Sequence, residues 1–260
     1  MIHLFALLSL LLCGVCYTGF QNSSHFHNTS NRRSLLLLVF GGALLLRLLL
    51  AYTTHGFSND IACFAAWADR IFTLGPGQFY SAEMFTDYPP GFMYVLYLIG
   101  ALRSLLQIPY YSDLHILLLK SPAILCDIAC GFLLYREAVK RLHFSDLQGI
   151  FAASAYLFQP AVILNSSCWG QVDSVYTLMI ILMCLFLMKG NLLPAYAVYG
   201  LGVLLKPQML IFTPVLLAGI WDHVFLQDFS WRKFFYNLCG GLVVICGMLL
   251  LTIYFNVGIL

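Results

Sequence analysis

Long apolar segments alternate with short polar ones along most of the 260-residue chain. The longest of them match the roughly 20 residues that a helix needs to cross a hydrocarbon core about 30 Å thick. The predicted membrane spans are residues 34–52, 113–135, 147–165, 174–188, 192–205, 209–225 and 236–256. The pattern therefore predicts an all-α fold, a polytopic transmembrane helical bundle.

The longest interval between these spans, residues 53–112, is a predicted outer loop that contains amphipathic juxtamembrane helices. Within residues 61–72 the apolar side chains recur at helical spacing, on a face made of Ile61, Phe64, Ala65, Ala68 and Phe72. We expect a short helix in the membrane interface, with residues 58–60 at its N-terminus. A second apolar stretch, residues 91–106, either crosses the membrane or lies along its outer face.

The distribution of lysine and arginine decides between these two arrangements, because cytoplasmic loops carry an excess of basic residues. If residues 91–106 lie along the outer face, the cytoplasmic loops hold Arg32, Arg33, Arg136, Lys140, Arg141, Lys189, Arg232 and Lys233. If residues 91–106 cross the membrane, most of these charges move outside. The juxtamembrane arrangement is therefore predicted, and it places the polar loops near residues 60, 87, 169–174 and 206–208 on the non-cytoplasmic side.

The predicted domain organisation is an N-terminal apolar segment with a cytoplasmic link, residues 1–33, followed by a transmembrane domain, residues 34–260. Residues 1–20 lack the basic start of a typical signal peptide. Three interpretations stay open for them: a signal sequence, a signal anchor or a first span. Because the chain stops directly after a predicted span, we expect the transmembrane domain to be incomplete at its C-terminus.

Composition supports an integral multi-pass membrane protein, with 61% hydrophobic and 9% charged residues. The net charge of +2 argues against a nucleic-acid partner, because no basic face is available to neutralise phosphates. No cofactor is predicted. The nine cysteines show no metal-ligand spacing, and Asp60 has no neighbouring histidines, so no tight metal site is expected, although a divalent cation stays open.

Charged side chains gather in the first part of the outer loop, although they are rare elsewhere. They are Asp60, Asp69, Arg70, Glu83 and Asp87. Carboxylates are costly near hydrocarbon, so this gathering indicates a site. Asp60 is the first candidate for a catalytic carboxylate, since a hydroxyl nucleophile needs a base within hydrogen-bond reach. An N-terminal cap of the following helix is an equal alternative for Asp60.

Two further motifs suit substrate binding. In Asp87-Tyr88-Pro89-Pro90, the prolines fix the backbone and orient Asp87 and Tyr88, although a helix start with proline at its first position is an alternative. In residues 169–174 (WGQVDS), the Trp169 indole, the Gln171 amide and Asp173 suit a sugar. The alternative makes Trp169 an interfacial anchor and Asp173 a helix cap.

The remaining candidates are cationic or amide side chains near the ends of spans. Lys206, in Lys206-Pro207-Gln208, either stabilises a leaving phosphate, with Gln208 beside it, or snorkels to the surface. Arg47 has the same two interpretations, and His55 either orients a substrate or lies in water. Lys120 and Asp127 share a helical face but are separated by about 10 Å of helical rise, so each needs another partner.

These motifs, in this order, resemble the GT-C membrane glycosyltransferases. The resemblance rests on the first-loop Asp60, on DYPP at 87–90, on Lys120 and Asp127 in one span, on YLFQPAVILNSSCWGQVDS at 156–174 and on LLKPQ at 204–208. It covers about residues 34–225. The pattern is most similar to bacterial proteins related to the second GPI mannosyltransferase, and more distantly to the glucosyltransferases of lipid-linked oligosaccharide assembly.

The resemblance implies a GT-C-like fold and an inverting glycosyltransferase, mannosyltransferase-like, that uses a polyprenyl- or dolichyl-phosphate sugar. The acceptor would be a hydroxyl of a glycan or lipid-linked molecule on the non-cytoplasmic face, in a bacterial plasma membrane or a eukaryotic endoplasmic reticulum. It makes Asp60 the base and carries Asp87, Gln171, Asp173, Lys206 and Gln208 over as pocket residues. The rival functions are a polytopic transporter or lipid flippase, suggested by the intramembrane charges, and a non-catalytic truncated homologue.

Overall fold

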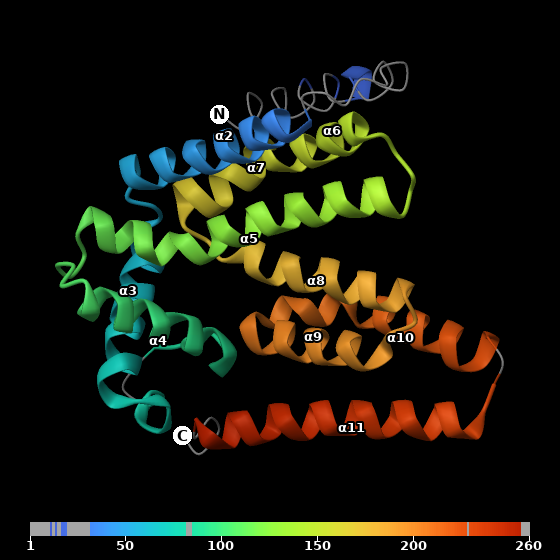
Figure 1. The fold of residues 1–260 in the computed structure, drawn as a ribbon. Helices are drawn as coiled ribbons and strands as arrows, with labels where there is room; N and C mark the ends of the chain where they lie inside the picture. Colours follow the sequence, from blue (N-terminus) through green and yellow to red (C-terminus); the bar gives the residue numbers. More distant parts are fainter. Residues whose placement is uncertain are drawn as a thin grey trace. The chain divides into compact units, whose positions relative to one another are not determined.

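The computed structural model describes residues 11, 14, 17–19, 32–81, 85–227 and 229–255. Its helices are α2 (Arg32–Thr53), α3 (Ser58–Leu74), α4 (Pro90–Leu105), α5 (Asp113–Lys140), α6 (Asp146–Leu157), α7 (Pro160–Ile163), α8 (Asp173–Met188), α9 (Leu192–Leu205), α10 (Thr213–Trp221) and α11 (Trp231–Tyr254) (Figure 1). Short 3₁₀ or π-helical segments cover Pro76–Gln78, Leu164–Trp169, Pro207–Phe212 and Asp222–Leu226. Within the described residues the regular structure is entirely helical, which confirms the all-α prediction.

Four helical segments in this part of the chain are long and apolar enough to cross a membrane: α2, α5, Pro207–Leu226 and α11. A fifth is formed if α6 and Pro160–Trp169 act as one span, although their axes differ by 51°. The apolar helices α4, α8 and α9 are shorter. The structure is thus consistent with a multi-pass membrane protein. The predicted segment 1–20 lies outside the continuously described residues.

The chain divides into two compact units, and the first contains residues 1–62 and 109–175. Here α2 and α6 pack against α5 and run in the opposite direction to it (Figure 1). The buried core contains Ala43, Tyr135, Ile150, Ala153 and Leu157. Because of this antiparallel arrangement, the C-terminal end of α2 and the start of α5 lie at the same end of the unit as residues 169–173.

The predicted span 147–165 is interrupted, which corrects the expectation of one straight helix. The helix α6 ends at Leu157, Gln159 is extended at φ −61° and ψ 119°, and α7 begins at Pro160. Proline lacks an N–H group and disfavours helical geometry in the residue before it, which explains the break. The chain then continues into the π-helical segment Leu164–Trp169.

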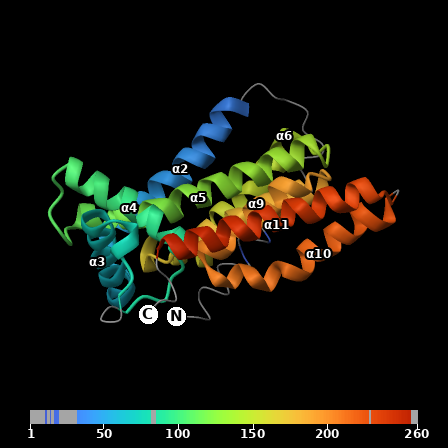
Figure 2. The ribbon, with the colours of Figure 1, turned by 90° about the horizontal axis from the view of Figure 1, so that it is seen from below.

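The second unit contains residues 63–108 and 176–260, with α9 packed between α4 and α11. Its core is built mainly from α8, α9 and the α10 region: Met183, Leu192, Ala195, Tyr196, Met209, Leu216 and Val224. The part of α3 in this unit runs across the direction of α9 and α11 in both views (Figures 1 and 2). The position of this helix along the membrane surface stays a prediction.

The helix α3 is longer than predicted, because it begins at Ser58 and ends at Leu74. Most of the predicted apolar face is buried, including Phe64 and Ala68. Phe64 packs against the rings of Tyr88 and Phe92, at centroid distances of 5.5 and 5.4 Å.

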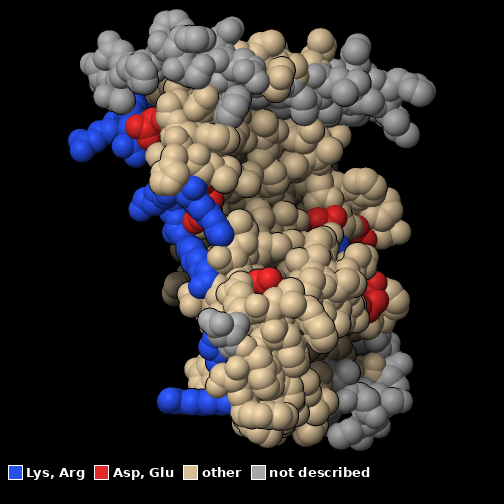
Figure 3. Space-filling view, turned by 90° about the vertical axis from the view of Figure 1, so that its right-hand side faces the viewer, with Lys and Arg blue, Asp and Glu red and all other residues tan. Residues whose placement is uncertain are grey.

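Basic side chains lie at one end of each unit. In the first unit they lie in the last two turns of α5 and directly after it: Arg136, Lys140 and Arg141. In the second unit they lie between α8 and α9 and in the first turn of α11: Lys189, Arg232 and Lys233. Figure 3 shows that lysine and arginine side chains are exposed at the surface. In the first unit, Asp60 and Gln171 lie at the other end from these cations. The second unit also carries Arg70, Arg103 and Lys206 away from its basic end, so the predicted sidedness of the loops stays a prediction.

The contact between α4 and α9 requires a glycine at position 91. A Cβ atom there would lie 2.6 Å from the carbonyl oxygen of Leu204, which is backbone and cannot move aside. We expect Gly91→Ala to lower the free energy of unfolding by about 1–3 kcal/mol, as overpacking does. The measurement is SDS-induced unfolding in detergent micelles. Gly247→Ala is the control, because a Cβ at Gly247 meets nothing within 4 Å; equal stability of both variants would contradict the close approach.

Candidate functional site

Asp60 and Gln171 meet in the first unit, although 111 residues separate them in sequence. The Gln171 Nε2 atom donates a hydrogen bond to Oδ2 of Asp60, and both residues are half-buried. The backbone supports this contact, because Phe57 N donates to the carbonyl oxygen of Trp169 at 2.9 Å. The predicted catalytic residue and one predicted binding residue therefore belong to one site.

Two glycines allow these segments to approach each other. Gly56 has φ +80°, and a Cβ there would lie 2.8 Å from the Trp169 carbonyl oxygen. Gly170 is left-handed at φ 87° and ψ 23°, and a Cβ there would lie 2.6 Å from the Ile61 side chain. Only glycine adopts such positive φ values at little cost. Gly170 directs the chain so that Gln171 faces the first turn of α3.

The amide hydrogen bond orients the Asp60 carboxylate, which is what a general base requires. The helix begins two residues before Asp60, so this residue is the third of α3 and not the residue that precedes the helix. The N-cap alternative is therefore wrong, although a carboxylate in the first turn still interacts favourably with the helix dipole. The helix holds the carboxylate, and Gln171 orients it.

Arg47 forms a buried ion pair inside the first unit. Its Nε atom lies 3.0 Å from Oδ2 of Asp127, and neither side chain is exposed. Asp127 also accepts hydrogen bonds from the hydroxyls of Ser166 at 2.6 Å, Ser174 at 2.5 Å and Tyr156 at 3.2 Å. The interpretation of Arg47 as a snorkelling side chain is wrong, and its burial does not support a contact with a substrate phosphate. Charges in an apolar bundle pair internally because water cannot solvate them.

The Lys120 ammonium joins the end of α2 to the π-helical segment. Its Nζ atom donates to the carbonyl oxygens of Ala51 at 3.2 Å, Thr54 at 2.6 Å and Ser167 at 2.9 Å. Carbonyls at a helix C-terminus lack intrahelical partners, so a cation stabilises them. The prediction that Lys120 and Asp127 each have other partners is confirmed. These contacts are structural and give no support to a permeation path.

The other predicted residues of the first unit lie at the same end of it. Asp173, in the first turn of α8, accepts a hydrogen bond from Asn165 Nδ2 at 2.9 Å. Trp169 is 51% exposed and packs edge-on against Phe57. His55 is exposed, and its Nδ1 atom lies 3.7 Å from an Asp113 carboxylate oxygen. The hydrogen bond from Asn165 orients Asp173, whereas Trp169 and His55 are surface residues.

The second unit brings together Lys206 and Tyr88. The Lys206 ammonium lies 5.8 Å from the centroid of the Tyr88 ring and 5.6 Å from that of Tyr176. Lys206 is 9% exposed, which argues against the alternative that it snorkels to the surface. Ammonium groups are attracted to aromatic faces, and this attraction strengthens on desolvation. The structure thus holds a cation at the end of α9.

Tyr80 fixes the backbone beside this cation. Its hydroxyl donates to the Tyr88 carbonyl oxygen at 2.8 Å. Burial raises the pKa of the Tyr80 phenol above its ordinary value, so the group stays protonated and remains a donor. Asp87 and Gln208 are both exposed. Of the predicted residues in this unit, the structure therefore brings Tyr88 and Lys206 together and leaves Asp87 and Gln208 on the surface.

Other charges of the outer loop have structural partners. Arg103 of α4 pairs with Asp69 of α3, and Arg70 Nε donates to the Phe79 carbonyl oxygen at 2.7 Å. Glu83 lies outside the described residues. The gathering of charges in this loop thus reflects contacts that hold α3 and the following loop as well as a site. Among the described residues, no group of three or more His, Cys, Asp or Glu side chains is arranged to hold a metal ion.

The helices define the class as an all-α protein consistent with multiple membrane spans. Neither a protein-family model nor a curated protein matches the chain. The functional argument consequently rests on the residues and their geometry.

Proposed function

We propose that the protein is a membrane glycosyltransferase, mannosyltransferase-like, that moves a sugar from a polyprenyl-phosphate donor to an acceptor hydroxyl on the non-cytoplasmic face. The observation that carries the proposal is the hydrogen bond from Gln171 to Asp60, which orients a half-buried carboxylate. The polarity of the first unit supports the proposed face, because Asp60 lies at the end away from Arg136 and Lys140. The motif order that resembles the GT-C enzymes supports the donor class.

In the proposed reaction, the acceptor oxygen attacks the anomeric carbon of the donor and forms the new glycosidic bond. The bond from that carbon to the phosphate oxygen breaks, and polyprenyl phosphate leaves with the bonding electron pair. The acceptor proton passes to the Asp60 carboxylate, which acts as general base. Attack opposite the leaving group inverts the anomeric configuration.

The test of the proposal is sugar transfer in membranes that contain the protein, with radiolabelled polyprenyl-phosphate mannose, glucose and galactose as donors. Membranes without the protein are the control. We expect label from one donor to appear in a lipid or glycan product whose anomeric configuration is opposite to that of the donor. Absence of transfer from every donor, with the protein folded, would contradict the proposal.

Lys206 is the second part of the proposal, as the cation that binds the donor phosphate and stabilises its developing charge. We expect Lys206→Gln to lower kcat/KM about 100-fold, the effect of losing one preorganised electrostatic group, while Lys206→Arg keeps part of the activity. Lys189→Gln, which removes a cation from the other end of the same unit, is expected to be neutral. Equal activity of Lys206→Gln and wild type would remove Lys206 from the mechanism.

A further inference from the structure

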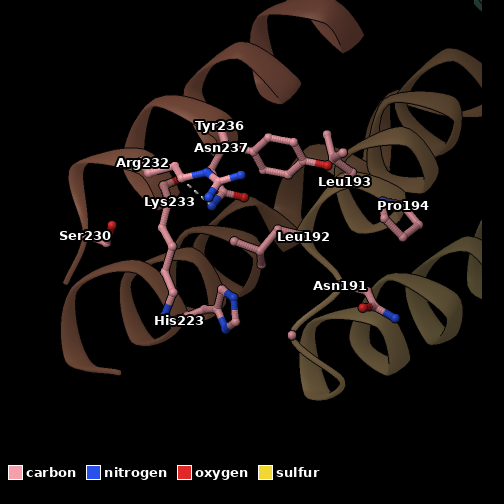
Figure 4. Close-up of a pocket in the computed structure, with 11 residues that line it drawn as sticks. Asn191, Leu192, Leu193, Pro194, His223, Ser230, Arg232, Lys233, Tyr236 and Asn237 are labelled. Carbon is pink, nitrogen blue, oxygen red and sulfur yellow. Dashed lines mark hydrogen bonds between the residues drawn. The ribbon is translucent and has the colours of Figure 1, made fainter. Parts of the chain in front are cut away.

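The second unit contains a cavity of about 710 Å³ at its basic end. Three segments form its walls: residues 190–194 at the start of α9, His223 after α10, and residues 230–237 at the start of α11 (Figure 4). The first turn of α9 contributes apolar surface through Leu192 and Pro194, and the first turn of α11 contributes Arg232 and Lys233. The cavity is therefore apolar on one wall and cationic on another.

The charge of this cavity is suited to an anion. Its described lining includes two cations, Arg232 and Lys233, and no Asp or Glu. Figure 4 shows the Lys233 side chain extending toward the His223 ring. The acidic residue next to His223, Asp222, accepts a hydrogen bond from Gln227 Nε2 at 2.6 Å. Arginine and lysine in this arrangement are the groups that bind phosphates.

A second cavity of about 250 Å³ shares one lining residue, Asn237, with the first. Apart from Asn237 and the hydroxyl of Tyr196, its lining is apolar and follows α11 through Leu238, Gly241 and Ile245. Asn237 is 9% exposed, and its Nδ2 donates to the Lys233 carbonyl oxygen at 2.8 Å. Along α11, a cationic cavity is thus followed directly by an apolar one, the order of a phosphate headgroup and its acyl chain.

The surroundings of the two cavities also suit a lipid. The helix α11 is long and apolar enough to span a membrane, and its first turns expose Trp231, Phe235 and Tyr236. Exposed aromatic side chains of this kind are typical of the membrane–water interface. The site differs from the proposed donor cation Lys206, since it lies at the opposite end of α9, about 20 Å away at 1.5 Å per residue.

We propose that these paired cavities bind an anionic phospholipid, with its phosphate at Arg232 and Lys233 and one acyl chain against Gly241. Basic pockets between membrane helices on the cytoplasmic side recognise anionic headgroups in this way. The apolar cavity favours a lipid over free phosphate, because inorganic phosphate has no apolar group that could fill the cavity. This site adds to the proposed transferase activity and does not depend on it.

The test uses the full chain purified in detergent, with dioleoyl phosphatidylglycerol, dioleoyl phosphatidylcholine and inorganic phosphate as probes. Native mass spectrometry measures lipid binding. Arg232→Gln with Lys233→Gln removes both cations, and Arg136→Gln with Lys140→Gln is its matched control in the first unit. Gly241→Leu fills the apolar cavity, and Gly247→Leu is its control. A Cβ at either glycine meets nothing within 4 Å, so both variants are expected to fold.

We expect the wild type to bind phosphatidylglycerol about tenfold more tightly than phosphatidylcholine, given the contribution of each basic residue near anionic lipid. The Arg232/Lys233 variant should lose this preference, and Gly241→Leu should weaken phosphatidylglycerol binding, while both controls retain it. An unchanged preference in the Arg232/Lys233 variant would overturn the proposal. Displacement of the lipid by inorganic phosphate, with full binding by Gly241→Leu, would overturn the lipid assignment and leave a small-anion site.

Discussion

The Asp60→Asn variant is expected to transfer sugar about 100- to 10,000-fold more slowly than the wild type, the range that a positioned general base contributes. Asparagine has nearly the same shape but cannot accept the acceptor proton. The loss should appear in kcat, with donor KM little changed, because the proton is transferred only in the reacting complex. The measurement is the initial rate of transfer in membranes at matched expression.

The control for this variant is Asp113→Asn, which removes an exposed carboxylate from the start of α5 in the same unit. Full activity is expected there. The transfer rate of Gln171→Leu is expected to lie between those of Asp60→Asn and Asp113→Asn, because the Asp60 carboxylate remains but loses the amide that orients it. Transfer by Asp60→Asn at the wild-type rate would return this residue to a purely structural role in the first turn of α3.

Arg47→Met is expected to lower the free energy of unfolding of the first unit by about 3–5 kcal/mol, the cost of breaking a buried ion pair on one side. The methionine fits an apolar site, but Asp127 stays buried with its hydrogen bonds to hydroxyls and without its cation. The measurement is the midpoint of SDS-induced unfolding in micelles. Lys140→Met, at the exposed end of α5, is the control and should leave the midpoint unchanged.

A double variant distinguishes the stability lost by breaking the ion pair from the stability lost through poorer packing. In Arg47→Met with Asp127→Leu both charges are absent, so no unpaired charge remains, and much of the lost stability should return. If the losses of unfolding free energy in the two single variants add up to the loss in the double variant, Arg47 and Asp127 are not coupled. That result would contradict the ion pair inferred from their 3.0 Å contact.

Much of the helical architecture was predictable, because apolar segment length is a strong signal in membrane proteins. The predicted spans 34–52 and 113–135 agree with α2 and α5, which are long enough to cross a membrane. The predicted spans 174–188 and 192–205 are present as the apolar helices α8 and α9, but both are shorter than a membrane span. The interruption at Pro160 was missed, although a proline inside an apolar segment was the available signal. Residues 58–60 were placed at the N-terminus of α3, and the helix does begin at Ser58; its end at Leu74 lies two residues beyond the predicted apolar segment 61–72.

The site was predictable in its residues and not in its contacts. Asp60 and Gln171 were each recognisable as polar residues next to membrane spans, but their hydrogen bond depends on how α3 meets the 169–171 segment. The partners of Asp127 were missed for the same reason. Ser166 and Ser174 are small and common in apolar helices, and only the burial of a carboxylate beside them shows why they are needed.

The two partners of the Arg47–Asp127 ion pair are synthesised at different times. Ribosomes add roughly 5–20 residues per second, so Arg47 precedes its partner by about 4–16 s. During this interval α2 carries an uncompensated charge, and the cost stays below about 2.5–3.5 kcal/mol, the value at the centre of a membrane helix, because Arg47 lies nearer the C-terminal end of α2. Its ten leucines offset this with about 3–6 kcal/mol, at roughly 0.3–0.6 kcal/mol each. The leucine-rich composition of α2 therefore lets the segment partition into the bilayer before the carboxylate that neutralises it has been translated.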